Sequence, residues 1–169
     1  MADRTRSSRL AWAAYGLALL IVVADQLSKY WIVAVYGLET RETTPILPFF
    51  SLTWVENRGV SFGLFQSPSG EETIRWALAA FSALVAIALA VWARKASRLL
   101  LAAAIGLIIG GAIGNLIDRV RYGYVVDFLD FSGLYFPWVF NVADAAINVG
   151  VALLLLDIFI TGDKDKAAV

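Results

Sequence analysis

The sequence predicts an all-α polytopic membrane protein with four transmembrane helices and a small β-structure in its first outward loop. Composition is the first observation: the 169 residues are 60% hydrophobic and 17% charged, with a mean hydropathy of +0.72. Soluble domains are about 45–50% apolar and about 25% charged, so the apolar content exceeds what a core requires. The second observation is that the apolar residues gather in four long runs, as in helices that cross a bilayer.

The first run is uninterrupted from Leu10 to Ala24, which gives roughly 22 Å of helix at about 1.5 Å per residue. A hydrocarbon core of about 30 Å requires more, so we expect this span to continue to Val35. We expect residues 1–169 to form a single integral membrane domain, because no repeat or linker divides them. The predicted spans are about residues 10–35, 76–93, 99–117 and 139–160.

A cleaved signal peptide is the alternative interpretation of the first run, because Arg4, Arg6 and Arg9 form a basic segment before it. The run is long, however, and it leads into Asp25 and Gln26 rather than into a cleavage site of small residues. We therefore interpret it as a retained membrane anchor.

The distribution of lysine and arginine predicts the orientation, because basic residues concentrate in short cytoplasmic segments. Five arginines lie in two longer loops, about residues 36–75 and 118–138. We expect these loops on the periplasmic face and both termini in the cytoplasm. The basic residues of the expected cytoplasmic side are Arg4, Arg6, Arg9, Arg94, Lys95, Arg98, Lys164 and Lys166.

The two outward loops differ in length and pattern. The longer one combines Pro45, Pro48 and Pro68 with β-forming and aromatic residues between Phe49 and Val55. This pattern predicts short strands on the membrane surface, where aromatic residues are frequent. The shorter loop ends in Phe136-Pro137-Trp138, which we expect to set up the start of the fourth helix.

Two ionisable residues interrupt the first span. Asp25 and Lys29 are spaced i,i+4, so they can pair on one helix face. Ionisable groups inside spans are rare and require a reason. We interpret the pair as structural and expect Lys29 to extend its amine to the outer interface.

The third span carries a stripe of glycines and a polar end. Gly106, Gly110 and Gly114 repeat at four-residue spacing, which lets another helix approach closely. Asn115 and Arg119 share a face at the end of this span, and Asp118 is expected to pair with Arg119. These polar groups either bond one another and a neighbouring backbone, or they shape a site.

Asp127 and Asp144 lie on the same outward side, one beyond the third span and one about a turn inside the fourth. Two close carboxylates cannot both ionise cheaply, so one keeps a proton and the pair titrates as a unit. Such a pair serves acid–base hydrolysis. From the pattern alone, two unrelated interfacial carboxylates are the default interpretation. Asn148 lies one turn beyond Asp144, on a face expected to point toward protein.

The residues that are missing exclude several kinds of chemistry. The sequence has no cysteine and no histidine, which excludes disulfides, thiolate nucleophiles, imidazole metal sites and Ser-His-Asp triads. The net charge is zero, so nucleic acid is not expected as a partner. The sequence suggests neither a metal nor an organic cofactor.

Five motifs, in this order and over nearly the whole chain, resemble those of the bacterial lipoprotein signal peptidases, also called signal peptidase II. Each motif is weak alone, and their order and spacing make the resemblance specific. The motifs are Asp25-Gln26-Leu27-Ser28-Lys29, Asn57-Arg58-Gly59-Val60-Ser61-Phe62-Gly63, Gly114-Asn115-Leu116-Ile117-Asp118-Arg119, Val125-Val126-Asp127-Phe128 and Phe140-Asn141-Val142-Ala143-Asp144.

The resemblance implies an intramembrane aspartyl endopeptidase of the bacterial inner membrane. Such hydrolases remove the signal peptide from diacylglyceryl-modified prolipoproteins, cutting just before the lipid-modified cysteine. Asp127 and Asp144 match the catalytic dyad, and Asp25 matches a position linked to integrity. The matched residues that bind substrate or shape the site are Asn57, Gly59, Asn115, Arg119 and Asn141.

The resemblance also implies partners and a surface structure. It predicts a small periplasmic β-cradle in the first outward loop, contact with membrane lipid, and inhibition by the cyclic peptide globomycin at the dyad. We expect a monomer without cofactors, in which Asp25, Lys29 and Asp118 are structural. One departure is that Val60 and Ser61 stand where the family more often has two alanines, and we expect altered substrate or lipid contacts there.

Three other functions remain open. A serine–lysine protease would have to use Lys29, which is expected to be paired. A small transporter could use Asp25 and Asp144 as ion sites, but such sites usually lie near the midplane in broken helices. A scaffold protein would leave the position of Asp144 unexplained.

Overall fold

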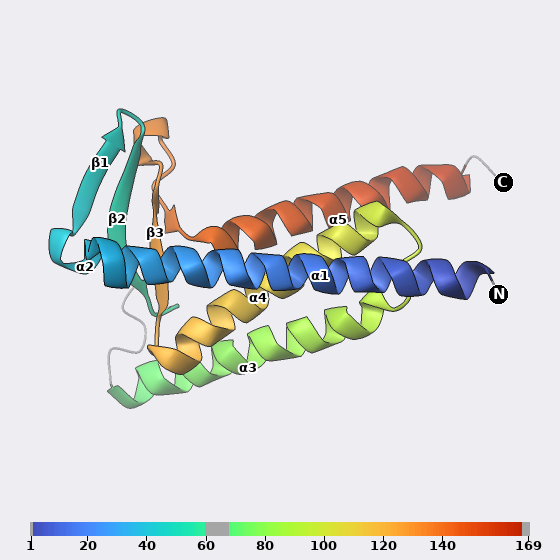
Figure 1. Ribbon diagram of the computed structural model, residues 1–169, viewed down its shortest axis with the longest axis horizontal. Helices are drawn as coiled ribbons and strands as arrows, with labels where there is room; N and C mark the ends of the chain where they lie inside the picture. The colour runs from blue at the N-terminus through green and yellow to red at the C-terminus, as the bar shows by residue number, and fades with distance from the viewer. Residues whose placement is uncertain (1, 60–67, 167–169) are drawn as a thin grey trace.

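Four long helices run along one another and carry a small β-sheet at one end, while both termini lie at the other (Figure 1). The computed structural model describes residues 2–59 and 68–166, so the predicted departure at Val60 and Ser61 lies outside the described residues. In chain order the elements are α1 (Ala2–Tyr30), η1 (Trp31–Tyr36), α2 (Leu38–Arg41), β1 (Thr43–Leu47), β2 (Phe50–Asn57), α3 (Pro68–Ala93), α4 (Leu99–Arg121), β3 (Val125–Asp130), η2 (Ser132–Leu134), β4 (Val139–Phe140) and α5 (Val142–Lys166).

Four of the described helical segments are long and apolar enough to cross a membrane, which confirms the expected number of long apolar helices. Their hydrophobic parts are Ser7–Tyr36, Glu72–Ala93, Leu99–Arg121 and Val142–Thr161. The first continues beyond α1 through η1, a π-helix that ends at Gly37 in the left-handed conformation (φ 66°). Such a widened turn is uncommon and is not visible in hydropathy.

The helix ends differ from the predicted spans, and three of the differences lie toward the sheet. The third helix continues beyond residue 117 to Arg121, and the second begins before residue 76, at Pro68. The fourth helix begins at Val142, slightly later than the approximate start predicted at residue 139, because Val139 and Phe140 form β4. Apolar strand residues directly before a helix extend its hydrophobic run, so hydropathy alone merges the two elements.

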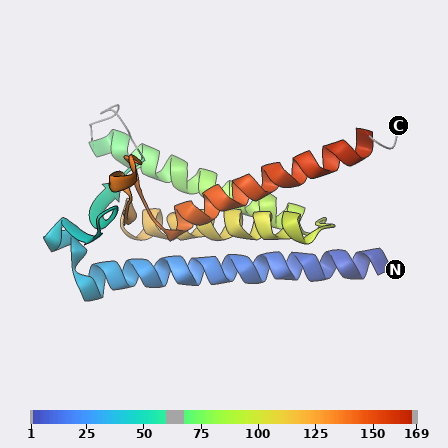
Figure 2. The same cartoon turned by 90° about the horizontal axis from the view of Figure 1, so that it is seen from above.

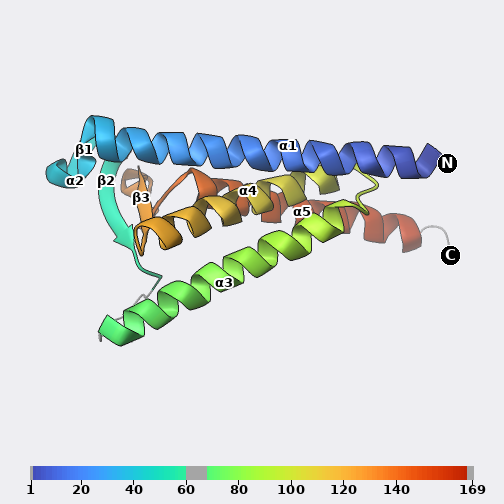
Figure 3. The same ribbon diagram turned by 60° about the horizontal axis from the view of Figure 1, so that its bottom comes forward.

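α4 is the central helix. It packs against α1, α3 and α5, and Figure 2 shows it lying between α1 and the other two. Of its most hydrophobic segment 67% is buried, against 17–22% for the other three spans. Figure 3 shows α3 close to α1 at the end near the termini and diverging from it toward the sheet.

The glycines of α4 permit this central position. A Cβ on Gly106 would lie 2.6 Å from the Ala14 carbonyl oxygen of α1, and a Cβ on Gly111 would lie 2.3 Å from the Ala143 carbonyl oxygen of α5. Both distances are far shorter than real Cβ contacts, so α4 touches backbone on two sides. The predicted packing role of the glycine stripe is confirmed toward α1, and Gly111 extends it to α5.

The sheet joins the two outward loops. Its order is β1-β2-β3-β4 with antiparallel pairing throughout, and β2 and β3 pair Val55 with Asp127 and Asn57 with Val125. Strands in the first loop were predicted, but the second loop also supplies two, so the description as all-α with strands only in the first loop is incomplete. Val125–Asp130 is completed as a strand by hydrogen bonds to β2, a partner distant in sequence.

The sheet is fixed to the helices by its own apolar cluster. Ile32 of η1 and Leu38 of α2 are fully buried against Leu52, Val126 and Phe128. Neighbouring residues of β3 therefore anchor the strand on both sides of Asp127. The position of this carboxylate is thus determined by packing as well as by its hydrogen bonds.

Candidate active site

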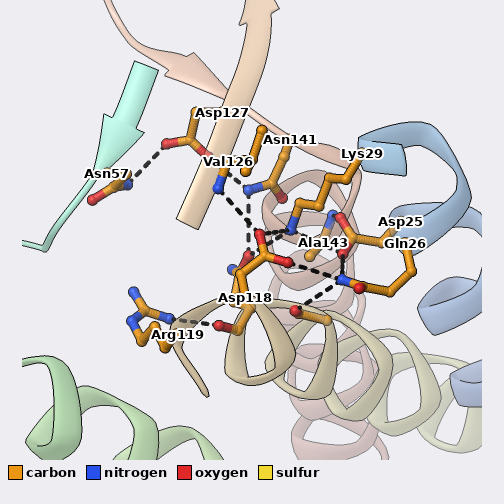
Figure 4. A network of polar contacts seen from close by, with 12 residues as sticks. Asp25, Gln26, Lys29, Asn57, Asp118, Arg119, Val126, Asp127, Asn141 and Ala143 are labelled. Carbon is orange, nitrogen blue, oxygen red and sulfur yellow. Dashed lines mark hydrogen bonds and ion pairs between the residues drawn. The ribbon is translucent and has the colours of Figure 1, made fainter. Parts of the chain in front are cut away.

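Asp127 lies in β3 with only 1% of its surface exposed. Its two carboxylate oxygens accept hydrogen bonds from two side-chain amides: Asn57 Nδ2 at 2.9 Å and Asn141 Nδ2 at 2.6 Å (Figure 4). Asn57 is the last residue of the neighbouring strand β2, and Asn141 precedes α5. The sheet and the start of the last helix therefore hold this carboxylate together.

Asp144 lies in the first turn of α5. Its backbone N–H donates to Asn141 Oδ1 at 2.9 Å, which is the usual bond between an N-terminal cap and its helix. Its Oδ1 accepts from Asn115 Nδ2 of α4 at 2.7 Å. The positive end of the helix dipole favours a negative charge at this position.

Asn141 couples the two aspartates. Its oxygen caps Asp144 while its nitrogen donates to Asp127, so neither bond survives a flip of the amide. This arrangement brings together the two carboxylates that the sequence predicts to form a pair. It also explains why an asparagine is required before the helix: a carboxylate cannot donate and an aliphatic side chain can do neither.

The amide of Asn57 is oriented in a similar way. Its Oδ1 accepts from the backbone N–H of Gly59 at 2.9 Å, which leaves its Nδ2 facing Asp127. Gly59 has φ +77°, a conformation that favours glycine, and a Cβ there would overlap Leu78 Cδ1 of α3. Gly59 therefore supports the site through Asn57.

Burial, and after it the nearby negative charge of Asp144, raise the pKa of Asp127 to about 7. The amides of Asn57 and Asn141 act in the opposite direction, because they stabilise the ionised form. No ion pair joins either aspartate to a lysine or arginine in the part of the chain that the structure describes. A proton is therefore available at this position near neutral pH.

A second carboxylate cluster lies beside the first and is neutralised. Lys29 Nζ lies 2.9 Å from Asp25 Oδ2 and 2.7 Å from Asp118 Oδ2. Gln26 Nε2 donates to the same two carboxylates, at 3.1 and 3.0 Å. The predicted pairing of Asp25 with Lys29 is confirmed. Lys29 is only 3% exposed, so the expectation that its amine extends to the interface is wrong.

Asp118 does not pair with Arg119 as predicted. Successive helix residues point about 100° apart, and Asp118 faces Lys29 of α1 while Arg119 faces α3. Arg119 Nη1 donates to the Asn115 carbonyl at 3.4 Å, and Arg119 forms no ion pair among the described residues.

The neutralised cluster holds the backbone next to each member of the dyad. Asp25 Oδ1 accepts the N–H of Ala143, which precedes Asp144, at 3.0 Å. Asp118 Oδ2 accepts the N–H of Val126, which precedes Asp127, at 3.1 Å. Figure 4 shows Lys29 between these two carboxylates, beside the strand of Asp127. The residues predicted as structural therefore position both candidate catalytic residues.

Asn115 connects the two clusters. Its Oδ1 accepts from Lys29 Nζ at 3.4 Å and its Nδ2 donates to Asp144 at 2.7 Å. Asn141 Nδ2 lies 3.3 Å from the same oxygen. Lys29 thus orients the Asn115 amide that donates to Asp144. Among the described residues, no group of three acidic side chains converges in a way that could hold a metal ion.

Arg75 is a positioning residue that the sequence analysis counted only as a loop cation. Its Nε donates to the Arg119 carbonyl at 2.7 Å and its Nη2 to the Val120 carbonyl at 2.9 Å. These are end carbonyls of α4 that lack helical partners. Arg75 therefore ties the outer end of α3 to α4 beside the site. The position of Arg75 in the sequence, just before an apolar run, does not indicate these bonds to backbone carbonyls.

Two clefts lie near the site, and both are lined by Ile147. The first has a volume of about 420 Å³ and includes Asn57, Asp144 and the predicted inward residue Asn148, together with Phe136, Trp138, Val139 and Phe140. The second, about 280 Å³, is mostly apolar and lies between α3, α4 and α5. It is lined by Leu78, Phe81, Ser82, Val85, Ile108, Ala112, Asn115, Arg119 and Ile147.

The chain resembles known proteins over most of its length. A family profile described as signal peptidase (SPase) II matches residues 17–160. A lipoprotein signal peptidase of Caulobacter vibrioides is 58% identical over 158 residues, covering 93% of this chain and 92% of that protein. One from Shewanella halifaxensis is 42% identical over 170 residues, covering 98% and 96%.

Two solved structures share the fold. A bacterial membrane enzyme determined by the in meso method at 2.3 Å resolution has a TM-score of 0.76 and 28% identity, covering 90% of each chain. Another, at 1.9 Å resolution, has a TM-score of 0.71 and 31% identity, covering 86% of this chain and 92% of that one. The family that the sequence motifs resembled is thus confirmed: the chain belongs to the signal peptidase II family of aspartic-type membrane proteases, which cleave the signal peptides of prolipoproteins.

Proposed function

We propose that Asp127 and Asp144 are the catalytic dyad with which this chain cleaves diacylglyceryl-modified prolipoproteins just before the lipid-modified cysteine. The observation that carries this proposal is the Asn141 amide, which bonds Asp127 through its nitrogen and caps Asp144 through its oxygen. One amide thereby fixes a buried carboxylate, Asp127, and a partly buried one, Asp144, and no cation pairs with either among the described residues.

The reaction is an acid–base hydrolysis. Asp127, with its pKa near 7, carries the shared proton and hydrogen-bonds to the scissile carbonyl oxygen. Asp144 acts as the general base and removes a proton from water as the water oxygen attacks the carbonyl carbon. When the tetrahedral intermediate collapses, the C–N bond breaks and the cysteine nitrogen takes a proton from the dyad. The pair then returns to its singly protonated state.

The remaining site residues orient these groups. Asn57, Asn115 and Asn141 fix the carboxylates, and Gly59 fixes the Asn57 amide. Arg119 lines the apolar cleft beside Asn115, where its guanidinium is available to the substrate backbone. The signal peptide and the acyl chains of the substrate occupy the two clefts that meet at Ile147, and a globomycin-type inhibitor competes for the same space.

The proposal is tested by a gel-shift cleavage assay with purified protein and a diacylglyceryl-modified prolipoprotein. Wild type is expected to cleave, and Asp144→Asn is expected to be folded and inactive. Asp130→Asn is the matched control, because Asp130 lies on the same strand as Asp127 but faces Thr53. Cleavage by Asp144→Asn at the rate of the control would refute the dyad. A folded wild type that leaves a confirmed lipidated substrate intact would favour the transporter instead.

We further propose that the protein is a monomer with both termini in the cytoplasm and the dyad at the periplasmic face. The density of basic residues in the short segments supports this orientation. The chain has no cysteine, so single-cysteine labelling has no background. An impermeant maleimide should label Tyr135→Cys, whose site is 99% exposed beside the dyad end, in intact cells. Ser97→Cys, in the α3–α4 turn, should be labelled only after lysis.

A further inference from the structure

The end of the bundle opposite the dyad has a cleft of its own. It has a volume of about 510 Å³ and lies between the first turns of α1 and the turn that joins α3 to α4. Figures 1 and 3 both show these two segments near each other, at the end away from the sheet. The lining residues are Ser7, Ser8, Ala11, Trp12, Tyr15 and Arg94.

Two long-range hydrogen bonds hold the walls of this cleft. Ser7 Oγ donates to the Arg94 carbonyl at 2.6 Å, and the Tyr15 hydroxyl donates to the Ala90 carbonyl at 2.8 Å. Trp12 packs edge-on against Tyr15, with ring centroids 5.8 Å apart. The cleft is therefore maintained by contacts between α1 and α3 and does not depend on a loose loop.

The cleft lies at the boundary between hydrocarbon and water. The hydrophobic part of α1 begins at Ser7, and that of α3 ends at Ala93, one residue before Arg94. Trp12 is 73% exposed on this apolar surface, as is typical of tryptophan at a membrane interface. The polar rim of the cleft is thus at headgroup depth, and its apolar wall is at acyl-chain depth.

The charge at this rim is positive. Arg94 is exposed, and no carboxylate pairs with it among the residues that the structure describes. The nearby Arg98 is already engaged, since its Nη2 lies 3.0 Å from Asp157 Oδ2. Arg94 therefore presents at the rim a guanidinium that is unpaired within the described part of the chain. A guanidinium is planar and can bind a phosphate through two parallel hydrogen bonds.

We propose that this cleft binds the headgroup of an anionic glycerophospholipid. The phosphate pairs with Arg94 at the rim, and an acyl chain lies along Ala11, Trp12 and Tyr15. The occupant is a lipid rather than a free anion because the phosphate position continues directly into an apolar, membrane-facing wall. This site is separate from the dyad and holds whether or not the proposed peptidase chemistry is correct.

Native mass spectrometry of delipidated protein in detergent tests the proposal, with phosphatidylglycerol, phosphatidylcholine and inorganic phosphate as probes. Wild type should retain one phosphatidylglycerol more tightly than phosphatidylcholine. Arg94→Gln should weaken phosphatidylglycerol about fivefold, equivalent to about 1 kcal/mol per basic residue at an anionic surface. The matched control is Lys95→Gln, which removes the same charge from the next, exposed residue outside the cleft. It should change the affinity less than about twofold.

A second variant, Trp12→Ala, removes most of the apolar wall that Trp12 forms and keeps the rim charge. It should also weaken phosphatidylglycerol, with the melting temperature unchanged, because Trp12 is largely exposed. Equal losses in Arg94→Gln and Lys95→Gln would show only general attraction to negative charge and would overturn the site. Displacement of phosphatidylglycerol by inorganic phosphate would show that the cleft recognises a free anion. Equal binding of the two lipids would overturn the assignment to an anionic headgroup.

Discussion

Two pairs of carboxylates lie next to each other at the sheet end of the bundle, and they differ in what holds their charge. Asp25 and Asp118 share Lys29 and Gln26, and each also accepts a backbone N–H. Asp127 and Asp144 are held by asparagine amides and a helix cap. Three of the four carboxylates are at most 1% exposed, so burial does not distinguish the pairs.

The distinguishing factor is the cation. A buried carboxylate beside an ammonium has its charge compensated and acts as a fixed hydrogen-bond acceptor. A buried carboxylate that receives only amide hydrogen bonds, next to a second carboxylate, retains a proton that it can give away. The first pair is therefore suited to holding backbone in place, and the second to moving protons. The side chains of Asn115 and Asn141 lie between the two pairs of carboxylates.

Matched substitutions in the two pairs of carboxylates should give two different phenotypes, loss of activity in one pair and loss of stability in the other. Asp127→Asn should lower kcat by between about 10² and 10⁴, because the dyad loses its acid–base pair, with little loss of folded protein. Asp118→Asn should lower thermal stability while the folded fraction still cleaves. Both are measured by the gel-shift assay and by melting in detergent. An inactive but fully stable Asp118→Asn would place this residue in the chemistry.

Lys29→Met should destabilise the protein by about 3–5 kcal/mol, because it leaves two buried carboxylates without their cation. The free energy of unfolding is measured by denaturant titration in mixed micelles, with Lys95→Met as the exposed control. Adding Asp118→Asn to Lys29→Met should restore part of the loss, since one unpaired charge is removed. A double variant that is less stable than either single one would contradict the assignment of Lys29 to charge neutralisation.

Asn115→Ala tests the residue that both pairs share. It removes the hydrogen bond to Asp144 and leaves the Lys29 ion pairs in place. We expect kcat to fall between about 10- and 100-fold, corresponding to the loss of a charge-assisted hydrogen bond of about 1.5–3 kcal/mol. Steady-state kinetics separate kcat from KM. An unchanged kcat with a raised KM would mean that Asn115 binds substrate and does not orient the dyad.

The pH dependence gives the smallest effect. The pKa of Asp127 is near 7, so the shared proton is present below this pH and lost above it, and kcat/KM should fall as the pH rises past about 7. The same raised pKa means that protonated Asp127 favours the fold at low pH, and this contribution is lost between the ordinary carboxylate pKa and about 7. Asp127→Asn should abolish that part of the pH dependence of stability.

Asn57→Ala refines this measurement. The Asn57 amide stabilises ionised Asp127, so its removal should shift the alkaline limb of the kcat/KM profile upward by up to about one pH unit. Thr53→Ala, which removes the hydroxyl that bonds Asp130 on the same strand pair, is the control and should not shift the limb. A downward shift would mean that Asn57 favours the protonated form.

The sequence predicted what depends on local composition. Four apolar runs required four long helices, and Asp144 was recognisable because it lies inside one of them without a neighbouring cation. The spacing of Asp25 and Lys29 predicted their ion pair, since i,i+4 residues share a helix face. The family motifs supplied Asn57 and Asn141, whose hydrogen bonds to Asp127 have no local signature.

What the sequence could not predict depends on contacts between distant segments. Asp118 was assigned to its neighbour Arg119, whereas its actual partner is Lys29 of α1. Val125–Asp130 has no alternation that marks a strand, and it becomes one only by pairing with β2. Arg75 acts through two backbone carbonyls, which are invisible in a pattern of side chains.

The bond from Asp25 to the Ala143 N–H has a consequence for synthesis, since its two residues lie 118 positions apart. A ribosome adds about 5–20 residues per second, so Asp25 waits between about 6 and 24 seconds before its last partner is made. During that time Lys29, four residues away, already neutralises it within the same helix. Asp127 and Asp144 come together only after the final helix has been made, so on the proposed mechanism every unfinished chain is inactive.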